Sequence, residues 1–87
     1  MKAKYMFEIM ELDDGMVAVP VGNDSEQFHG VLKVNETAAT ILKLLENEIT
    51  QEEIVEALLK EYEGSKDEIT ESVREYIELL TAENVIA

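Results

Sequence analysis

The spacing of apolar residues changes near Asn35, and this change constrains the fold more than any other feature of the 87-residue sequence. Before Asn35, apolar side chains alternate with polar ones or stand in short β-branched runs, which is typical of strands. After Asn35 they recur every three or four residues, which is typical of amphipathic helices. Strands followed by helices predict an α+β domain, not a parallel α/β sheet.

Three strands are predicted in the first part of the chain, over residues 5–10, 16–21 and 27–34. The sequence Asp13-Asp14-Gly15 predicts a tight hairpin turn between the first two, because Asp and Gly tolerate positive φ. Pro20 lacks an amide donor, so it is expected at the end of the second strand or beside a bulge. The third strand follows a polar connector.

Helix starts are indicated by three capping signals. Asn35 is a good N-cap for a first helix. Thr50 and Glu53 have the spacing of a capping box, which opens a second helix. Ser65 and Glu68 have the same spacing before a third. We therefore expect one domain over residues 1–87, with strands over about 5–34 and helices over about 35–84. Three antiparallel strands followed by three helices resemble a winged helix-turn-helix.

Charge limits the partners that the surface can bind. The chain holds 20 acidic and seven basic residues, for a net charge of −13. Nucleic-acid affinity comes largely from Lys and Arg neutralising phosphates, and anionic membranes attract basic segments in the same way. The composition therefore argues against nucleic-acid and membrane partners. The acidic residues are interpreted mainly as a solubilising surface.

Residue types that carry chemistry are scarce. There is no cysteine and only one histidine, His29, so the usual zinc sites cannot be assembled within one chain. No glycine-rich phosphate loop is present. We expect no catalytic residues, no metal site and no cofactor. The lack of a long apolar run or a secretory signal predicts a cytoplasmic protein.

An acyl or peptidyl carrier protein is an alternative for a small acidic chain. Such carriers attach phosphopantetheine to the serine of an Asp-Ser-Leu sequence. Here Asp24-Ser25-Glu26 lacks the leucine and leads into a predicted strand. The strand-rich start also does not fit a four-helix carrier, so this alternative is disfavoured.

The segment from Val34 to Ile86 carries a family resemblance. It resembles the opening of the first helix, the second and third helices, and the chain ending of PqqD-like proteins. Glu46-Asn47-Glu48 stands where the family often has Asp-Gly, and Asn84 stands where it usually has Gly; Asn and Gly both tolerate left-handed backbone. The residues that carry the resemblance are Val34-Asn35-Glu36-Thr37-Ala38-Ala39-x-Ile41-Leu42-x-Leu44, Ile49-Thr50-x-x-Glu53-Ile54-Val55-x-x-Leu58, Tyr62, Val73-x-x-Tyr76-Ile77 and Asn84-Val85-Ile86.

Such proteins are similar to the RiPP recognition element. The resemblance implies that the chain binds the leader segment of a ribosomally made precursor peptide. It also implies presentation of that peptide to a modifying enzyme, often a radical S-adenosylmethionine (SAM) enzyme. The leader would add as a strand beside the third strand and lie against the third helix. An edge strand suits this role, because its unpaired amides and carbonyls can extend the sheet.

Peptide-binding residues are therefore expected on the third strand and the third helix. We expect Val73 and Ile77 to be shared between the core and the cleft, and Arg74 is the only arginine. The expected set is Phe28, His29, Gly30, Val31, Leu32, Lys33, Val34, Ile69, Val73, Arg74, Tyr76 and Ile77.

Two other functions stay open, a winged-helix transcription regulator and a protein–protein adaptor. From Asp67 to Glu83 the third helix holds six acidic residues and one basic residue, whereas a DNA-reading helix needs the opposite balance. The sequence leaves open the precursor, the product, the partner enzyme and a strand-exchanged homodimer. It also leaves open which side of the third strand's backbone is free.

Overall fold

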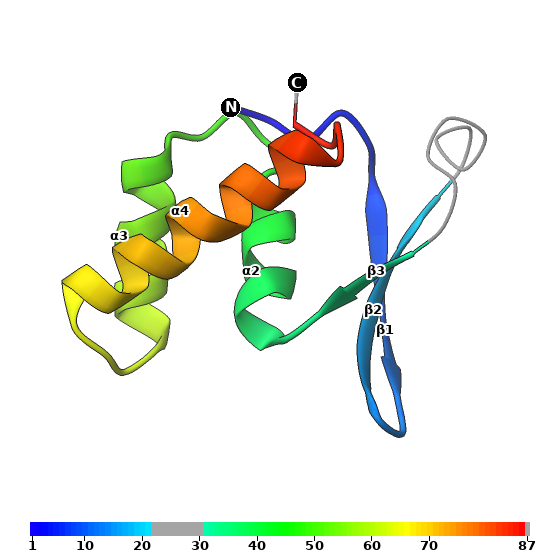
Figure 1. Cartoon of the computed structure of the whole chain (residues 1–87), viewed down its shortest axis with the longest axis horizontal. Coiled ribbons are helices and arrows are strands. Elements are labelled where there is room, and N and C mark those ends of the chain that lie inside the picture. Colours follow the sequence, from blue (N-terminus) through cyan, green and yellow to red (C-terminus); the bar gives the residue numbers. More distant parts are fainter. Residues whose placement is uncertain (22–30, 87) are drawn as a thin grey trace.

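The computed structural model describes residues 1–21 and 31–86. Within these residues three strands precede three helices (Figure 1), which confirms the predicted α+β class. Residues 27–30 of the predicted third strand lie outside the described ranges, and Val31 precedes the observed strand, which covers Leu32–Val34. The elements are β1 (Phe7–Leu12), β2 (Gly15–Pro20), β3 (Leu32–Val34), α2 (Glu36–Leu44), α3 (Gln51–Glu61) and α4 (Lys66–Ala82).

The strands form an antiparallel sheet in the order β1-β2-β3, so β2 is central. Leu12 pairs with Gly15, which leaves Asp13 and Asp14 as the turn of the predicted hairpin. The positive φ falls on Gly15, at 147°, and on neither aspartate. The turn is therefore where the sequence predicted it, but glycine alone adopts the unusual backbone conformation.

The three helices begin at the predicted caps. The side chain of Asn35 accepts a hydrogen bond from the amide of Ala38 at 2.8 Å. Thr50 and Glu53 form both bonds of a capping box, at 3.1 and 3.0 Å. Ser65 accepts from the amide three residues on, at 3.1 Å. These local bonds satisfy helix-start amides that have no partner within the helix.

The two ends of the described chain meet at one end of the molecule (Figure 1). Asn84, at φ 62°, ends α4 in the left-handed region. The chain then folds back, so that Val85 is fully buried and its carbonyl accepts from the amide of Lys4 at 2.6 Å. Ala3 and Ile86 form an isolated bridge. Residues 85–86 therefore pack against the core.

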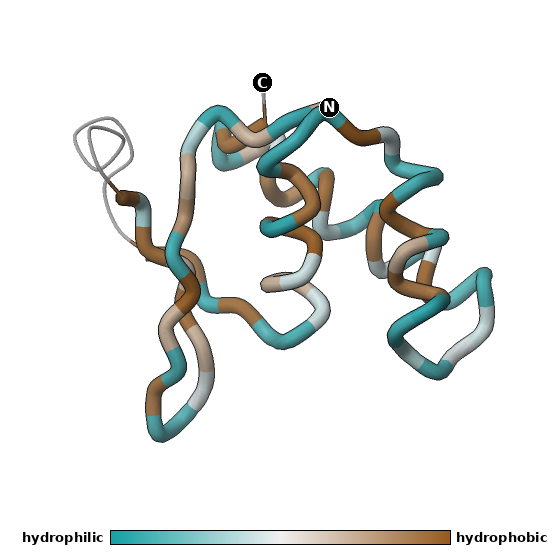
Figure 2. The backbone as a smooth tube through the Cα atoms, turned by 180° about the vertical axis from the view of Figure 1, so that it is seen from behind, coloured by the Kyte–Doolittle hydropathy of each residue, from teal (hydrophilic) through white to brown (hydrophobic). Residues whose placement is uncertain are grey.

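The core lies between the inner face of the sheet and the helices. Hydrophobic and polar residues alternate along the helices (Figure 2), so each helix turns one apolar side inward. α3 and α4 pack against each other. None of the described helices is long and apolar enough to cross a membrane. The largest fully buried side chains are Ile41, Leu45, Ile54, Leu58, Leu80, Val73 and Val85.

Candidate functional site

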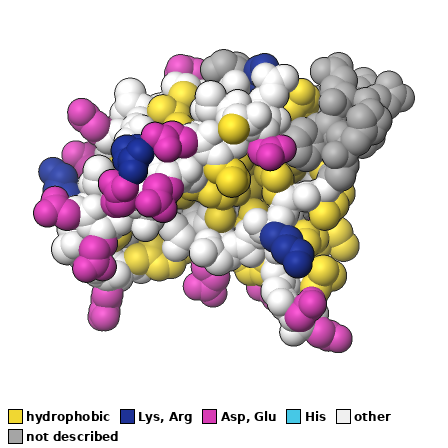
Figure 3. All heavy atoms as spheres, viewed as in Figure 1, with side chains coloured by type: hydrophobic (Ala, Val, Ile, Leu, Met, Phe, Trp, Pro, Cys, Tyr) yellow, Lys and Arg dark blue, Asp and Glu magenta, His cyan; other side chains and the backbone are white. Residues whose placement is uncertain are grey.

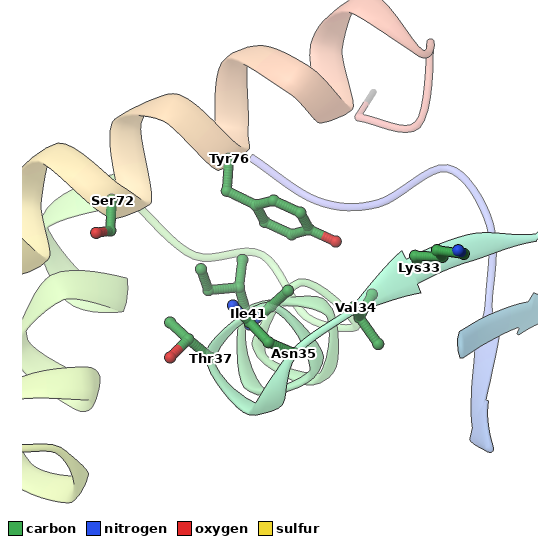
Figure 4. A pocket seen from close by; sticks show the side chains of 8 residues that line it. Lys33, Val34, Asn35, Thr37, Ile41, Ser72 and Tyr76 are labelled. Carbon is green, nitrogen blue, oxygen red and sulfur yellow. The ribbon is translucent and has the colours of Figure 1, made fainter. Parts of the chain in front are cut away.

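A cavity of about 250 Å³ lies where β3, α2 and α4 meet (Figure 4). The strand contributes one wall and α4 the opposite wall, while α2 forms the floor. Hydrophobic side chains are visible between α4 and the strands, and acidic side chains surround the helical part of this face (Figure 3). The lining residues are Lys33, Val34, Asn35, Thr37, Ala38, Ile41, Ser72 and Tyr76.

A second cavity, also of about 250 Å³, continues from the first toward the turn between α3 and α4. Thr37 and Ser72 line both cavities. We call the two cavities together the groove. Its second part is lined by Thr37, Leu58, Tyr62, Glu63, Gly64, Glu68, Ile69 and Ser72.

The hydrogen bonding of β1 to β2 determines which backbone groups of β2 are free to bind β3. The amide of Val21 donates to the carbonyl of Met6 at 3.1 Å. Opposed pairs in an antiparallel ladder alternate between bonded and non-bonded. Val19 and Val17, two and four residues before Val21, therefore also turn their backbone groups toward β1. The residues between them turn theirs toward β3.

The same alternation leaves one backbone edge of β3 open. Leu32 pairs with Ala18, and Val34 pairs with Met16, so the amides and carbonyls of Leu32 and Val34 are used by β2. Lys33 lies between them, and its amide and carbonyl point away from the sheet. Within the described residues no strand lies beyond β3. The open edge at Lys33 therefore borders the groove.

Side chains on β3 also divide by phase. Leu32 and Val34 are half-buried and pack against the core. Lys33 is exposed, as is Val31 just before the strand. Val31 shares the phase of Lys33, so continued alternation turns its amide outward. The predicted residues Phe28, His29 and Gly30 lie outside the described residues.

Tyr76 has an unsatisfied hydroxyl. Its ring lies above Ile41 and its oxygen is directed toward β3 (Figure 4). That oxygen is closed off from solvent and has no hydrogen-bond partner among the described residues. Burial raises the pKa of Tyr76 to about 12, so the phenol is neutral at physiological pH. A buried hydroxyl without a partner costs about 1–3 kcal/mol.

Tyr62 in the second part of the groove provides a contrast. Its hydroxyl lies 2.9 Å from Oγ1 of Thr40 and donates to the carbonyl of Glu36 at 3.4 Å. Two half-buried tyrosines thus line the same groove, one with a satisfied hydroxyl and one without.

Arg74 is engaged on the outer side of α4. Its guanidinium donates to Glu78 at 2.7 Å and also to Glu71. The hydrogen bond from Arg74 lowers the pKa of Glu71. Two residues along a helix turn a side chain by about 200°, so Arg74 points away from the face that carries Ser72 and Tyr76. The structure does not bring Arg74 into the groove.

Other predicted residues of α4 divide between core and groove. Val73 has no exposed surface and Ile77 is 9% exposed, so they support the groove wall from behind. The expected sharing of Val73 with the cleft is therefore not seen. Ile69 is half-buried and lines the second part of the groove, and Tyr76 lines the first.

The sequence prediction omitted Ser72 and Leu79. Ser72 lines both parts of the groove. Leu79 is 49% exposed and, at helical spacing, follows Ser72 and Tyr76 on the same face of α4. Ser72, Tyr76 and Leu79 form a stripe at helical spacing beside the apolar core stripe. This spacing was the sequence signal that could have identified Ser72 and Leu79 as groove residues.

The groove holds few groups suited to catalysis or metal binding. In the ranges 1–21 and 31–86, no three His, Cys, Asp or Glu side chains are placed to hold a metal ion. The groove offers instead an open strand edge, apolar side chains and hydroxyls. Such an arrangement is suited to binding an extended peptide.

Comparison with protein families identifies one family over most of the chain. The family model described as coenzyme PQQ synthesis protein D (PqqD) matches residues 15–86. The match includes β2, β3, all three helices and the groove between them. Comparison with curated protein sequences gave no match.

Two solved structures share the fold. The first, described as TbiB1 in complex with the TbiA(beta) leader peptide, is 22% identical with a TM-score of 0.71, over 98% of this chain and 93% of that one. The second, described as lasso peptide synthetase B1 complexed with the leader peptide, is 19% identical with a TM-score of 0.66. The similarity covers 97% of this chain and 93% of the synthetase chain.

Proposed function

The chain belongs to the PqqD family, and we propose that it is a single, non-catalytic domain that binds the leader segment of a ribosomally made precursor peptide. The observation that carries the proposal is the open backbone edge at Lys33 beside the groove. Two proteins of the same fold are described in complex with leader peptides, which supports a peptide as the guest.

In this proposal the leader adds to β3 as a further strand. The guest residue opposite Lys33 exchanges two backbone hydrogen bonds with it, and its side chain lies on the outer face of the sheet. The residues before and after it turn their side chains inward, toward the groove. Backbone bonds then provide affinity for any extended peptide, and the groove selects among side chains.

We further propose that the bound peptide is presented to a modifying enzyme, and that this enzyme uses radical SAM chemistry. The motifs from Val34 to Ile86 that resemble PqqD-like proteins support this step. Modification of the peptide is assigned to the partner, because the family match supports a peptide-binding module.

The experiment is titration of the chain with the leader peptide of its precursor, followed by calorimetry. The open edge is tested by a matched pair of variants, Val31→Pro and Leu32→Pro. Proline at position 31 removes an outward amide and its ring obstructs the guest. This variant should remain folded and bind at least about tenfold more weakly, which corresponds to about 1.4 kcal/mol.

Leu32→Pro is the control, because its amide serves the bond to β2. It should lower the free energy of unfolding by more than about 1 kcal/mol. Circular dichroism during chemical denaturation measures the free energy of unfolding of both variants. If both stay fully folded and both bind the leader like the wild type, the β3 edge is not the binding site.

A further inference from the structure

We propose that the groove selects a guest that carries a neutral hydrogen-bonding side chain, an amide or a hydroxyl, and that the hydroxyl of Tyr76 recognises it. This inference rests on the proposed leader binding and specifies what the leader must contain. The chemistry comes from the cavity beside β3, whose lining combines apolar atoms with hydroxyl groups.

The hydroxyls of the groove are not all used by the protein. Outside the groove lining, Thr40 and Thr81 donate to carbonyls of their own helices, at 3.0 and 2.8 Å. Thr37 and Ser72, which line both parts of the groove, show no such bond within the described residues. With Tyr76, the first part of the groove presents three hydroxyls from two helices, and none of the three has a hydrogen-bond partner among residues 1–21 and 31–86.

Tyr76 is the one among them whose oxygen is enclosed. An enclosed hydroxyl loses its bonds to water, and a guest that supplies a partner restores them. The ring borders the cavity and its oxygen is directed toward β3 (Figure 4). We assign as its partner an inward side chain of a strand paired with Lys33.

Charge decides the class of side chain. The phenol is neutral below its pKa of about 12, so it can donate or accept but cannot neutralise an ion. The chain carries a net charge of −13, which disfavours a guest carboxylate. A basic guest residue would leave its charge in the apolar part of the cavity, over Ile41 and Val34. A neutral amide or hydroxyl fits both conditions.

The experiment uses peptides of about 20 residues, selected from a random display library in parallel against the wild type and Tyr76→Phe. Wild-type selection should enrich Asn, Gln, Ser or Thr at one inward position of the guest. Selection against Tyr76→Phe should enrich Leu, Met or Phe there. A synthetic wild-type-selected peptide should bind Tyr76→Phe about three- to tenfold more weakly, the range of one net hydrogen bond.

A stability measurement separates this role from a structural one. Tyr76→Phe removes an unsatisfied hydroxyl, so the free protein should unfold at the same or higher denaturant concentration. Tyr62→Phe is the matched control and should unfold at a lower concentration, because its hydroxyl has partners. The expected result for Tyr76→Phe is thus unchanged or raised stability together with weakened peptide binding.

The outcomes distinguish the two proposals. If the wild type selects no peptide and binds no leader, the proposed function is overturned and this inference with it. If the wild type binds but both selections enrich the same residues, only the role of Tyr76 is overturned. A loss of stability in Tyr76→Phe comparable to that of Tyr62→Phe would also overturn it, because the hydroxyl would then have an internal partner.

Discussion

β3 and α4 form opposite walls of one groove, yet they offer a guest different contacts. The strand has an open backbone edge at Lys33, since only its neighbours on either side bond to β2. The helix uses its backbone internally and presents only side chains. Backbone contacts are nearly independent of sequence, whereas side-chain contacts are not. In the proposed complex, β3 would therefore provide general affinity for extended peptides and α4 would provide selectivity.

The largest expected effect is on the free energy of unfolding, and it tests whether α4 has distinct core-facing and groove-facing sides. Leu80 has no exposed surface, while its neighbour Leu79 is 49% exposed. Leu80→Ala should lower the free energy of unfolding by about 2–5 kcal/mol, as buried leucine truncations do. Leu79→Ala should change it by no more than about 0.5 kcal/mol.

Chemical denaturation measures the free energy of unfolding of both leucine variants. Titration with the leader then measures the affinity of Leu79→Ala for the peptide. We expect this variant to bind the leader several-fold more weakly, at about 1 kcal/mol for lost apolar burial. Equal losses of stability in the two variants would mean that α4 has no separate groove side.

An intermediate effect, on binding affinity, tests whether β3 recognises the backbone of the leader peptide. Single N-methylation along a leader peptide removes one amide donor at a time. Only the residues that exchange bonds with the open edge should respond, so the losses should recur at every second guest residue. Each should weaken binding about tenfold, or about 1.4 kcal/mol.

Isothermal titration of the methylated series gives this pattern, and side-chain alanine variants of the same peptide are the control. Alanine effects should fall on the inward residues that lie between the sensitive amides. Methylation losses without a period of two would contradict strand addition beside Lys33.

The smallest effect concerns the outer side of α4. Arg74 bonds Glu71 and Glu78, and its exposed ion pairs are worth little because water and salt screen them. Arg74→Ala should leave leader affinity within about twofold and lower the unfolding free energy only slightly. Leader titration and denaturation of this variant provide the test. A tenfold loss of leader affinity would place the guest on the outer side of the helix.

Local signals predicted the positions of most elements. The caps at Asn35, Thr50 and Ser65 depend on bonds across three residues, so neighbouring residues suffice to identify them. The hairpin turn at Asp13-Asp14 is local in the same way. The family resemblance also rests on local helix motifs, and the family match over residues 15–86 confirms it.

Assignments that depended on side-chain direction were less accurate. Residues 69–80 carry a broad apolar stripe, but its period does not say which part meets the core and which part meets the groove. Val73 was expected to be shared between the core and the cleft but is fully buried in the core, whereas Leu79 was omitted and is exposed. The division depends on where α3 and β3 lie around α4.

The sequence by itself determined the order of strands and helices, the starting points of the helices and the acidic surface, because these depend on neighbouring residues and on composition. Only the tertiary structure decided which amides of β3 are free and which hydroxyls lack partners. The first depends on the register of β3 against β2 and of β2 against β1. The second depends on the packing around Tyr62 and Tyr76, because hydrogen bonds form between groups that only the fold brings together.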